Sequence, residues 1–200
     1  MITAMTFALA PWRSPLARAI HRNKSQPHHR FFQLATVTPE GKPRNRTVVF
    51  RGFLDQSNDF KIITDQRSEK MQHLTGDRLG EIAWYFTKTR EQFRLSGKIT
   101  AITAADHDSP FYVERTQTWQ SLSDAAREQF FWPTPAAQRS EDLADFQPSG
   151  VDCLEPGPNF VLLLFQVTAV DHLELRGNPQ NRFLYHLDGD RLWQKKTVNP

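Results

Sequence analysis

Residues 43–51, Pro-Arg-Asn-Arg-Thr-Val-Val-Phe-Arg, are the stretch on which the interpretation of this chain depends. Their β-branched and aromatic residues, from Thr47 to Phe50, predict a β-strand. Side chains alternate along a strand, so Arg46 shares a face with Val48, while Arg51 lies on the other face. A guanidinium held against a sheet suits a phosphate or a carboxylate. Taken alone, these nine residues favour the alternative of an edge strand with solvated arginines.

Composition predicts a globular protein that binds neither nucleic acid nor membrane. The net charge is only +3 over 200 residues, which is too low to indicate nucleic-acid binding. The longest apolar run, residues 160–165, is too short to span a bilayer, and the first ten residues lack the basic segment of a signal peptide. A lone cysteine, Cys153, excludes an intrachain disulfide and fits a cytoplasmic location.

Short strands dominate the predicted organisation, with helices beginning near Ser14-Pro15 (Ser14 as N-cap), Ser68, Ser109-Pro110 and Ser121. The expected strands cover residues 31–38, 44–53, 60–64, 79–87, 91–103, 159–175, 182–187 and 191–196. This pattern predicts a mainly β protein, a small antiparallel barrel with helical insertions, in a single domain over residues 1–200. Residues 105–158 read as a helical and loop insertion, in which residues 136–158 are loop-like and form either a flap or partner contact or a disordered segment.

Three further segments carry groups that could bind an anion. Residues 64–70 run from a strand end into a helix start, where Arg67, Ser68 and Lys70 add donors to free backbone N–H groups. An ordinary capped helix is the alternative. Gln92 and Arg94 share the polar face of strand 91–103, which a solvent-facing sheet would also explain, and Arg182 opens a later strand.

Other catalytic patterns are missing from the sequence. The seven histidines show no metal-ligand spacing, so no metal site is predicted. There is no nucleophile elbow, no phosphate-binding P-loop and no dinucleotide glycine fingerprint. A bound cofactor would therefore have to carry any chemistry.

Four ordered motifs resemble the pyridoxamine 5′-phosphate oxidase family. They are Arg46-Thr-Val-Val-Phe-Arg51-Gly-Phe, Ile63-Thr-Asp-Gln-Arg-Ser68-Glu-Lys70, Arg90-Glu-Gln92-Phe-Arg94-Leu-Ser-Gly97 and Asn178-Pro-Gln-Asn-Arg182-Phe. The similarity covers most of residues 30–104 and 159–200. Together with residues 119–133, it looks closest to a branch of related FMN-binding proteins known from cyanobacteria and plants.

The resemblance implies an FMN-binding split β-barrel that forms a homodimer with FMN at the subunit interface. It implies that cofactor contacts come from Arg46, Val48, Val49, Ile63, Thr64, Ser68, Lys70, Gln92 and Arg182, with Gln92 reaching the flavin of the partner subunit. Ser68 and Lys70 would bind the phosphate, Arg46 would contact the phosphate or the ribityl chain, and the backbone of Val48 and Val49 would line the ring. Arg51 would contact the substrate.

Several positions depart from the family pattern. Arg51 stands where the oxidases usually have lysine, Glu69 where they have arginine, and Leu173 where they have tryptophan. The Arg-Leu-His substrate motif is replaced by Pro179-Gln-Asn181. The sequence therefore favours an FMN-dependent oxidoreductase of unknown small-molecule substrate. Pyridoxamine or pyridoxine 5′-phosphate oxidase, an oxidase of the CH–NH2 donor type, is one alternative, and a non-catalytic flavin- or haem-binding protein is another.

Overall fold

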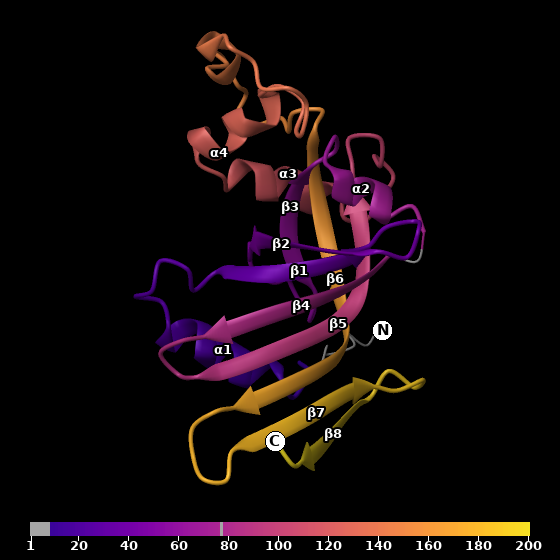
Figure 1. Cartoon of the computed structure of the whole chain (residues 1–200). Coiled ribbons are helices and arrows are strands. Elements are labelled where there is room, and N and C mark those ends of the chain that lie inside the picture. Colours follow the sequence, from indigo (N-terminus) through magenta and orange to yellow (C-terminus); the bar gives the residue numbers. More distant parts are fainter. Residues whose placement is uncertain (1–8, 77) are drawn as a thin grey trace.

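The structure is a computed structural model that describes residues 9–76 and 78–200 (Figure 1). Eight strands join in one antiparallel sheet. They are β1 (Phe31–Val37), β2 (Pro43–Val49), β3 (Phe60–Asp65), β4 (Leu79–Phe86), β5 (Glu91–Ile102), β6 (Phe160–Glu174), β7 (Asn181–Leu187) and β8 (Trp193–Val198). Each lies within about four residues of its predicted bounds, so the antiparallel β prediction is confirmed.

The strands are ordered β2-β1-β4-β5-β6-β7-β8, and β3 pairs with β6. The chain after β2 then closes the barrel. The N–H of Arg51 donates to the carbonyl of Lys61, and the Lys61 N–H donates to the carbonyl of Gly52, both at 2.9 Å. The predicted continuation of the second strand to Phe53 is therefore wrong, because residues 51–53 leave β1 and pair with β3 instead.

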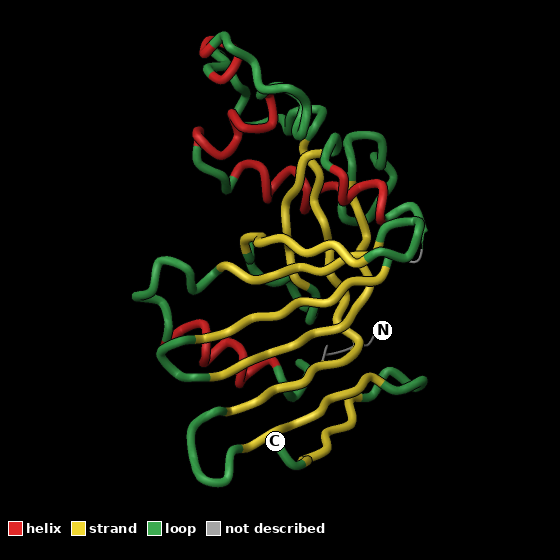
Figure 2. The backbone as a smooth tube through the Cα atoms, viewed as in Figure 1, coloured by secondary structure: helices red, strands yellow, loops and turns green. Residues whose placement is uncertain are grey.

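The long strand β6 belongs to two parts of the sheet. Its first half pairs with β3 and β5 inside the barrel, and its second half pairs with β5 and β7 (Figure 2). The register of β5 shifts between Ser96 and Gly97 where this change occurs. A Cβ on Gly97 would lie 2.2 Å from the carbonyl oxygen of Gln166, so only glycine permits this close approach. The result is a split barrel, as predicted.

Aromatic side chains fill the barrel. Phe60 contacts Phe32, Phe50, Trp84 and Phe165 with ring centroids 5.2–6.3 Å apart. These side chains are buried inside the barrel, as expected for alternate residues along a strand. Aromatic pairs of this kind contribute about 0.5–1.5 kcal/mol each beyond their buried area. The core thus forms a rigid support for the polar groups at the barrel ends.

Helix α1 (Arg13–Arg22) packs Leu16 and Ala19 against this core, as predicted. Its N-cap is Trp12, whose ring is fully buried, so the predicted cap at Ser14 is wrong. Burial of the tryptophan sets the start of the helix two residues earlier than the Ser-Pro pattern indicates. Within the described residues, no helix is long and apolar enough to cross a membrane.

The segment 105–158 projects from one end of the barrel, where α3 (Tyr112–Gln120) lies across β6 (Figures 1 and 2). Helix α4 (Asp124–Glu128) begins after Ser123, so the predicted start at Ser121 is wrong. The short 3-10 helices η1 (Gln129–Phe131) and η2 (Leu143–Phe146) follow. Trp119 and Phe130 pack on Phe160 of β6, which anchors the segment to the sheet.

Candidate functional site

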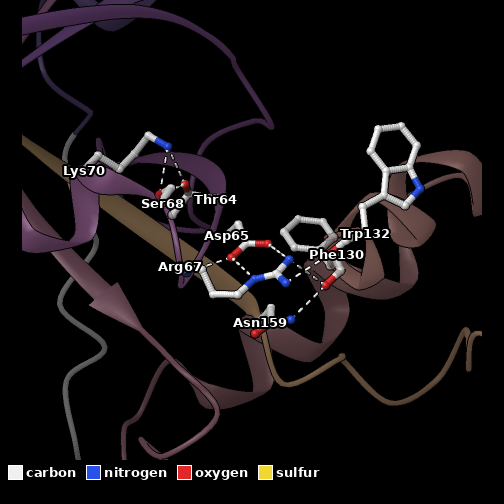
Figure 3. Close-up of polar contacts among 8 residues, drawn as sticks. All are labelled: Thr64, Asp65, Arg67, Ser68, Lys70, Phe130, Trp132 and Asn159. Carbon is white, nitrogen blue, oxygen red and sulfur yellow. Dashed lines mark hydrogen bonds and ion pairs between the residues drawn. The ribbon is translucent and has the colours of Figure 1, made fainter. Parts of the chain in front are cut away.

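Three polar side chains converge where β3 leads into the short helix α2 (Glu69–His73). The Nζ of Lys70 donates to the Thr64 Oγ1 at 2.7 Å and to the Ser68 Oγ at 3.1 Å, and the two hydroxyl oxygens are 3.1 Å apart (Figure 3). An ammonium has three N–H groups, so one remains for a ligand. The sequence predicts an anion site at this turn, and the structure brings the side chains of Thr64, Ser68 and Lys70 together there.

Arg46 of β2 approaches the same place from the inward face of the sheet. Its Nη1 donates to the carbonyl of Leu34 at 3.1 Å and to the Thr36 Oγ1 at 2.7 Å. Within the described residues, its Nε and Nη2 have no protein acceptor. Arg46, Thr64, Ser68 and Lys70 are called the Arg46–Lys70 cluster below.

Two cations in this cluster lack an acid to neutralise them. Burial lowers the pKa of Lys70, and the nearby charge of Arg46 lowers it further, against weaker opposing effects of Asp65 and Glu69. Burial also lowers the pKa of Arg46, against a weaker opposing effect of the Glu69 charge. Among residues 9–76 and 78–200, no carboxylate oxygen lies within 4.0 Å of either cation. Half-buried cations with hydroxyl donors beside them have the chemistry that could hold a phosphate group.

Arg67 takes no part in this cluster, so the prediction that it adds a donor for the anion is wrong. Its Nε and Nη2 donate to the two carboxylate oxygens of Asp65 at 3.0 and 2.7 Å. Its Nη1 donates to the carbonyl of Trp132 at 3.0 Å, and the Asn159 amide donates to the carbonyl of Phe130 at 2.9 Å (Figure 3). Arg67 therefore fastens the projecting segment to β3.

A cavity of about 700 Å³ lies between the barrel and the projecting segment. Val49, Ile63 and Thr64 line it from the barrel. Phe130, Trp132, Arg139 and Phe146 line it from the projecting segment. Thr64 belongs to both the cavity and the Arg46–Lys70 cluster, so the two adjoin at this residue, and the volume lies within the range of small-molecule sites. A ligand with a phosphate on the cluster could extend into this cavity.

Arg51, two residues beyond the end of β2, also lines the cavity. Its Nε is buried and has no hydrogen-bond partner among the described residues. Burial lowers the pKa of Arg51, and the charge of Arg30 adds to this effect. An anionic group in the cavity would supply the missing acceptor. Val48 packs half-buried against the core, so only its backbone remains available to a ligand.

Gln92 and Arg182 lie away from the cluster, on the outer face of the sheet. The register places Gln92 of β5, Leu173 of β6 and Arg182 of β7 in one row. Arg182 donates from Nε and Nη2 to Asp171 at 3.0 and 2.8 Å, and Arg94 donates to the same carboxylate at 2.5 Å. One chain therefore does not bring Gln92 and Arg182 to the cluster.

A second, more open cavity of about 710 Å³ lies beside α1. Its cations, such as Arg18, Arg22 and Lys88, are exposed, and Glu91 and Glu174 contribute carboxylates. Glu91 and Glu174 also lie near His172 at distances compatible with a metal ion, but Glu91 already accepts a hydrogen bond or ion pair from the His172 Nε2 at 3.0 Å. This cavity lacks the buried, unneutralised cations of the Arg46–Lys70 cluster.

Two residues that sequence reasoning missed support Arg46. Thr36 is buried on β1 and His73 is buried on α2, and their side chains are 2.8 Å apart. The signal in the sequence was a polar residue, Thr36, on the inward stripe of Phe32 and Leu34. Nothing in the sequence pairs Thr36 with His73, because 37 residues separate them.

The fold and this site define an FMN-binding split-barrel protein. Residues 9–103 match the family model described as pyridoxamine 5′-phosphate oxidase, FMN-binding domain. The chain is 36% identical over 195 residues to pyridoxine/pyridoxamine 5′-phosphate oxidase 2 of Arabidopsis thaliana, covering 96% of this chain and 98% of the relative. The chain therefore belongs to the pyridoxamine 5′-phosphate oxidase family and carries its FMN-binding domain.

Solved structures agree with this assignment. A pyridoxamine 5′-phosphate oxidase-related, FMN-binding protein from Nostoc punctiforme is 50% identical, with a TM-score of 0.94 over 96% of this chain and all of that one. PhzG from Burkholderia lata has a TM-score of 0.73 over 96% of this chain and 98% of its own, at 19% identity, and shows the fold alone. The predicted resemblance, cofactor and fold are confirmed.

Proposed function

We propose that this protein is an FMN-dependent oxidoreductase whose FMN phosphate binds the Arg46–Lys70 cluster. The observation that carries the proposal is the pair of half-buried cations, Arg46 and Lys70, without a carboxylate within 4.0 Å in the described chain. A phosphate dianion would neutralise both and accept from the Ser68 and Thr64 hydroxyls. When bound, FMN supplies the redox chemistry, and the protein orients it and shapes its surroundings.

The flavin ring is proposed to lie in the adjoining cavity. Val49 and Ile63 supply apolar wall there, and the backbone of Val48 and Val49 lies along the same strand. Thr64 leads from the phosphate cluster into the cavity, as the ribityl chain of FMN requires. The aromatic residues Phe130 and Trp132 complete an environment suited to a planar ring.

We further propose a homodimer in which Gln92 and Arg182 act on the partner subunit's flavin. Gln92 and Arg182 share the outer face of the sheet with exposed apolar side chains, including Tyr85 and Leu184. Phe31, also exposed, pairs with Val49 at the edge of the cavity. The cavity therefore adjoins an exposed, partly apolar face, which is where a second copy would bring additional flavin contacts.

The chain is proposed to function as one domain, with residues 105–158 as an insertion that walls the flavin cavity. The ion pair of Arg67 with Asp65, its bond to the Trp132 carbonyl and the packing of Trp119 on Phe160 support this role.

A cytoplasmic location is proposed because the lone Cys153 is free and exposed, which suits a reducing compartment.

A second candidate is pyridoxine or pyridoxamine 5′-phosphate oxidation. The buried, unpartnered Nε of Arg51 favours it, because a substrate phosphate in the cavity would satisfy that donor. The name of the Arabidopsis relative points the same way. Hydrogen peroxide formation with either substrate would support this activity, and no turnover by the FMN-loaded protein would exclude it.

An absorbance spectrum of the purified protein tests the main proposal. After incubation with FMN and removal of free cofactor, the protein is expected to retain a flavin spectrum, and a nicotinamide donor or another trial reductant is expected to bleach it. A colourless protein would contradict FMN binding, and a Soret band would indicate haem. A flavin spectrum that no donor or trial substrate bleaches would favour a non-catalytic flavin-binding protein.

A further inference from the structure

The buried stripe of β1 contains one polar side chain. Phe32, Leu34 and Thr36 alternate inward along the strand, and Thr36 is only 2% exposed. A hydroxyl buried to this extent requires hydrogen-bond partners. Both of its partners, Arg46 and His73, come from other elements of the fold.

The donors and acceptors around Thr36 can be assigned from chemistry. A guanidinium only donates, so the Thr36 Oγ1 accepts from the Arg46 Nη1 at 2.7 Å. The single hydroxyl hydrogen is then free for the His73 Nδ1 at 2.8 Å. The opposite assignment, with the imidazole donating, would leave this hydroxyl hydrogen buried and without an acceptor. His73 is therefore an acceptor at Nδ1, with its remaining ring nitrogen 3.7 Å from the Glu69 Oε1.

This chain of contacts joins the two cations of the cluster. Arg46 lies on β2 and Thr36 on β1, whereas His73 shares the five-residue helix α2 with Lys70. The polar contacts of the Arg46 guanidinium all use Nη1, which bonds Thr36 and the Leu34 carbonyl. This arrangement fixes one edge of the guanidinium and leaves Nε and Nη2 for a ligand.

We infer that Thr36 and His73 are positioning residues that orient Arg46 toward a phosphate group. The inference rests on the proposed placement of the FMN phosphate and extends it to two residues that make no proposed contact with the cofactor. Loss of the Thr36 hydroxyl would free Arg46 to adopt other rotamers, and binding would then have to restore the productive one. The effect should appear only with ligands that carry the phosphate.

The test compares FMN with riboflavin, which lacks the phosphate. Thr36→Val keeps the side-chain shape and removes the hydroxyl, whereas Thr36→Ser keeps the hydroxyl. We expect Thr36→Val to weaken FMN binding about tenfold and His73→Phe about threefold. Thr36→Ser should stay within about twofold of the unchanged protein, and riboflavin affinity should be the same in all four proteins. Flavin fluorescence quenching gives each Kd.

A double-mutant cycle separates positioning from general damage to the fold. In an Arg46→Met background, Thr36→Val should no longer change the FMN affinity, because the group that it orients is absent. Equal weakening of FMN and riboflavin by Thr36→Val, or an unchanged FMN affinity, would overturn the inference while the phosphate site stands. An unchanged protein that binds FMN no better than riboflavin would instead overturn the proposed phosphate site, and the inference with it.

Discussion

Two groups of basic side chains in this protein differ in what neutralises them. On the outer face of the sheet, Arg94 and Arg182 both bind the carboxylate of Asp171. In the Arg46–Lys70 cluster, the two cations have only hydroxyl and carbonyl acceptors. The comparison shows that the number of arginines does not locate an anion site. The proposed anion site lies instead where half-buried cations have no carboxylate within 4.0 Å among the described residues.

The largest expected effect is on cofactor affinity. Lys70→Met should weaken FMN binding by about tenfold to a hundredfold, because a charged hydrogen bond to the phosphate is lost. Equilibrium titration followed by flavin fluorescence measures the change. Arg94→Met serves as the matched control on the outer face, and it should leave the Kd within about twofold. Equal losses in the two variants would erase the distinction between the two groups.

FMN binding should weaken at a lower alkaline pH than the titration of an exposed lysine would predict. Burial and the charge of Arg46 lower the pKa of Lys70, so its ammonium loses its proton at a pH below the usual value of about 10.4. As the pH rises through that lowered pKa, the attraction to the phosphate is lost. The Kd measured from pH 7 to 10.5 should rise in the unchanged protein, with a much flatter profile in Lys70→Met. Parallel profiles would show that another group titrates.

Asp171→Asn should reduce thermal stability without affecting the Arg46–Lys70 cluster. The hydrogen bond from Arg182 lowers the pKa of the Asp171 carboxyl by more than burial raises it. The hydrogen bond from Arg94 lowers this pKa further. A lowered folded pKa contributes stability above the unfolded value of about 3.9, and this contribution disappears as pH falls through the folded pKa.

The exposed position of the arginines limits the expected loss at pH 7 to about 2–4 °C in Tm. Calorimetry at pH 7 and again below pH 3 measures it, and the difference between Asp171→Asn and the unchanged protein should shrink in acid. A difference of the same size at both pH values would show that the ionised carboxylate is not the source of the stability.

The smallest expected effect on FMN affinity is that of Arg67. This basic side chain lies near the cluster, but Asp65 neutralises its charge. Arg67→Met should leave the FMN Kd within about twofold, because its guanidinium binds Asp65 and the Trp132 carbonyl. It should instead speed hydrogen exchange of residues 130–135, which mass spectrometry of the peptides reports. A loss of FMN affinity as large as that of Lys70→Met would place Arg67 on the phosphate.

Alternation along the strands predicted much of the fold and part of the site. Inward and outward positions followed from the period of two, which predicts Arg46 and Arg51 on opposite faces. The strand end and helix start at residues 64–70 indicated Ser68 and Lys70 as further anion donors, and the family motifs implied that they share one cofactor with Arg46. The barrel closure by residues 51–53 was missed, because the hydrophobic pattern continues past Val49 while the pairing partner changes from β1 to β3.

Contacts over long sequence distances could not be predicted. Arg67 carries the same charge as Lys70, and its bonds to the carbonyls of Phe130 and Trp132 join residues more than 60 positions apart, in addition to its local ion pair with Asp65. The contact of Thr36 with His73 also joins residues far apart in the sequence, 37 positions from each other, and could not be predicted for the same reason. Residues 136–158 lack a clear period, so a flap or partner contact and a disordered segment stayed open as alternatives, and the residues of the barrel that part of this segment faces across the cavity could not be predicted.

The central claim, a phosphate site built from unneutralised cations, is tested most directly by comparing FMN and riboflavin on one protein. If Arg46 and Lys70 hold the phosphate, FMN should bind at least tenfold more tightly than riboflavin at pH 7. The combined variant Arg46→Met/Lys70→Met should bring the two Kd values together. Equal affinity of the unchanged protein for both flavins, or a preference for FMN that survives in the double variant, would contradict the account.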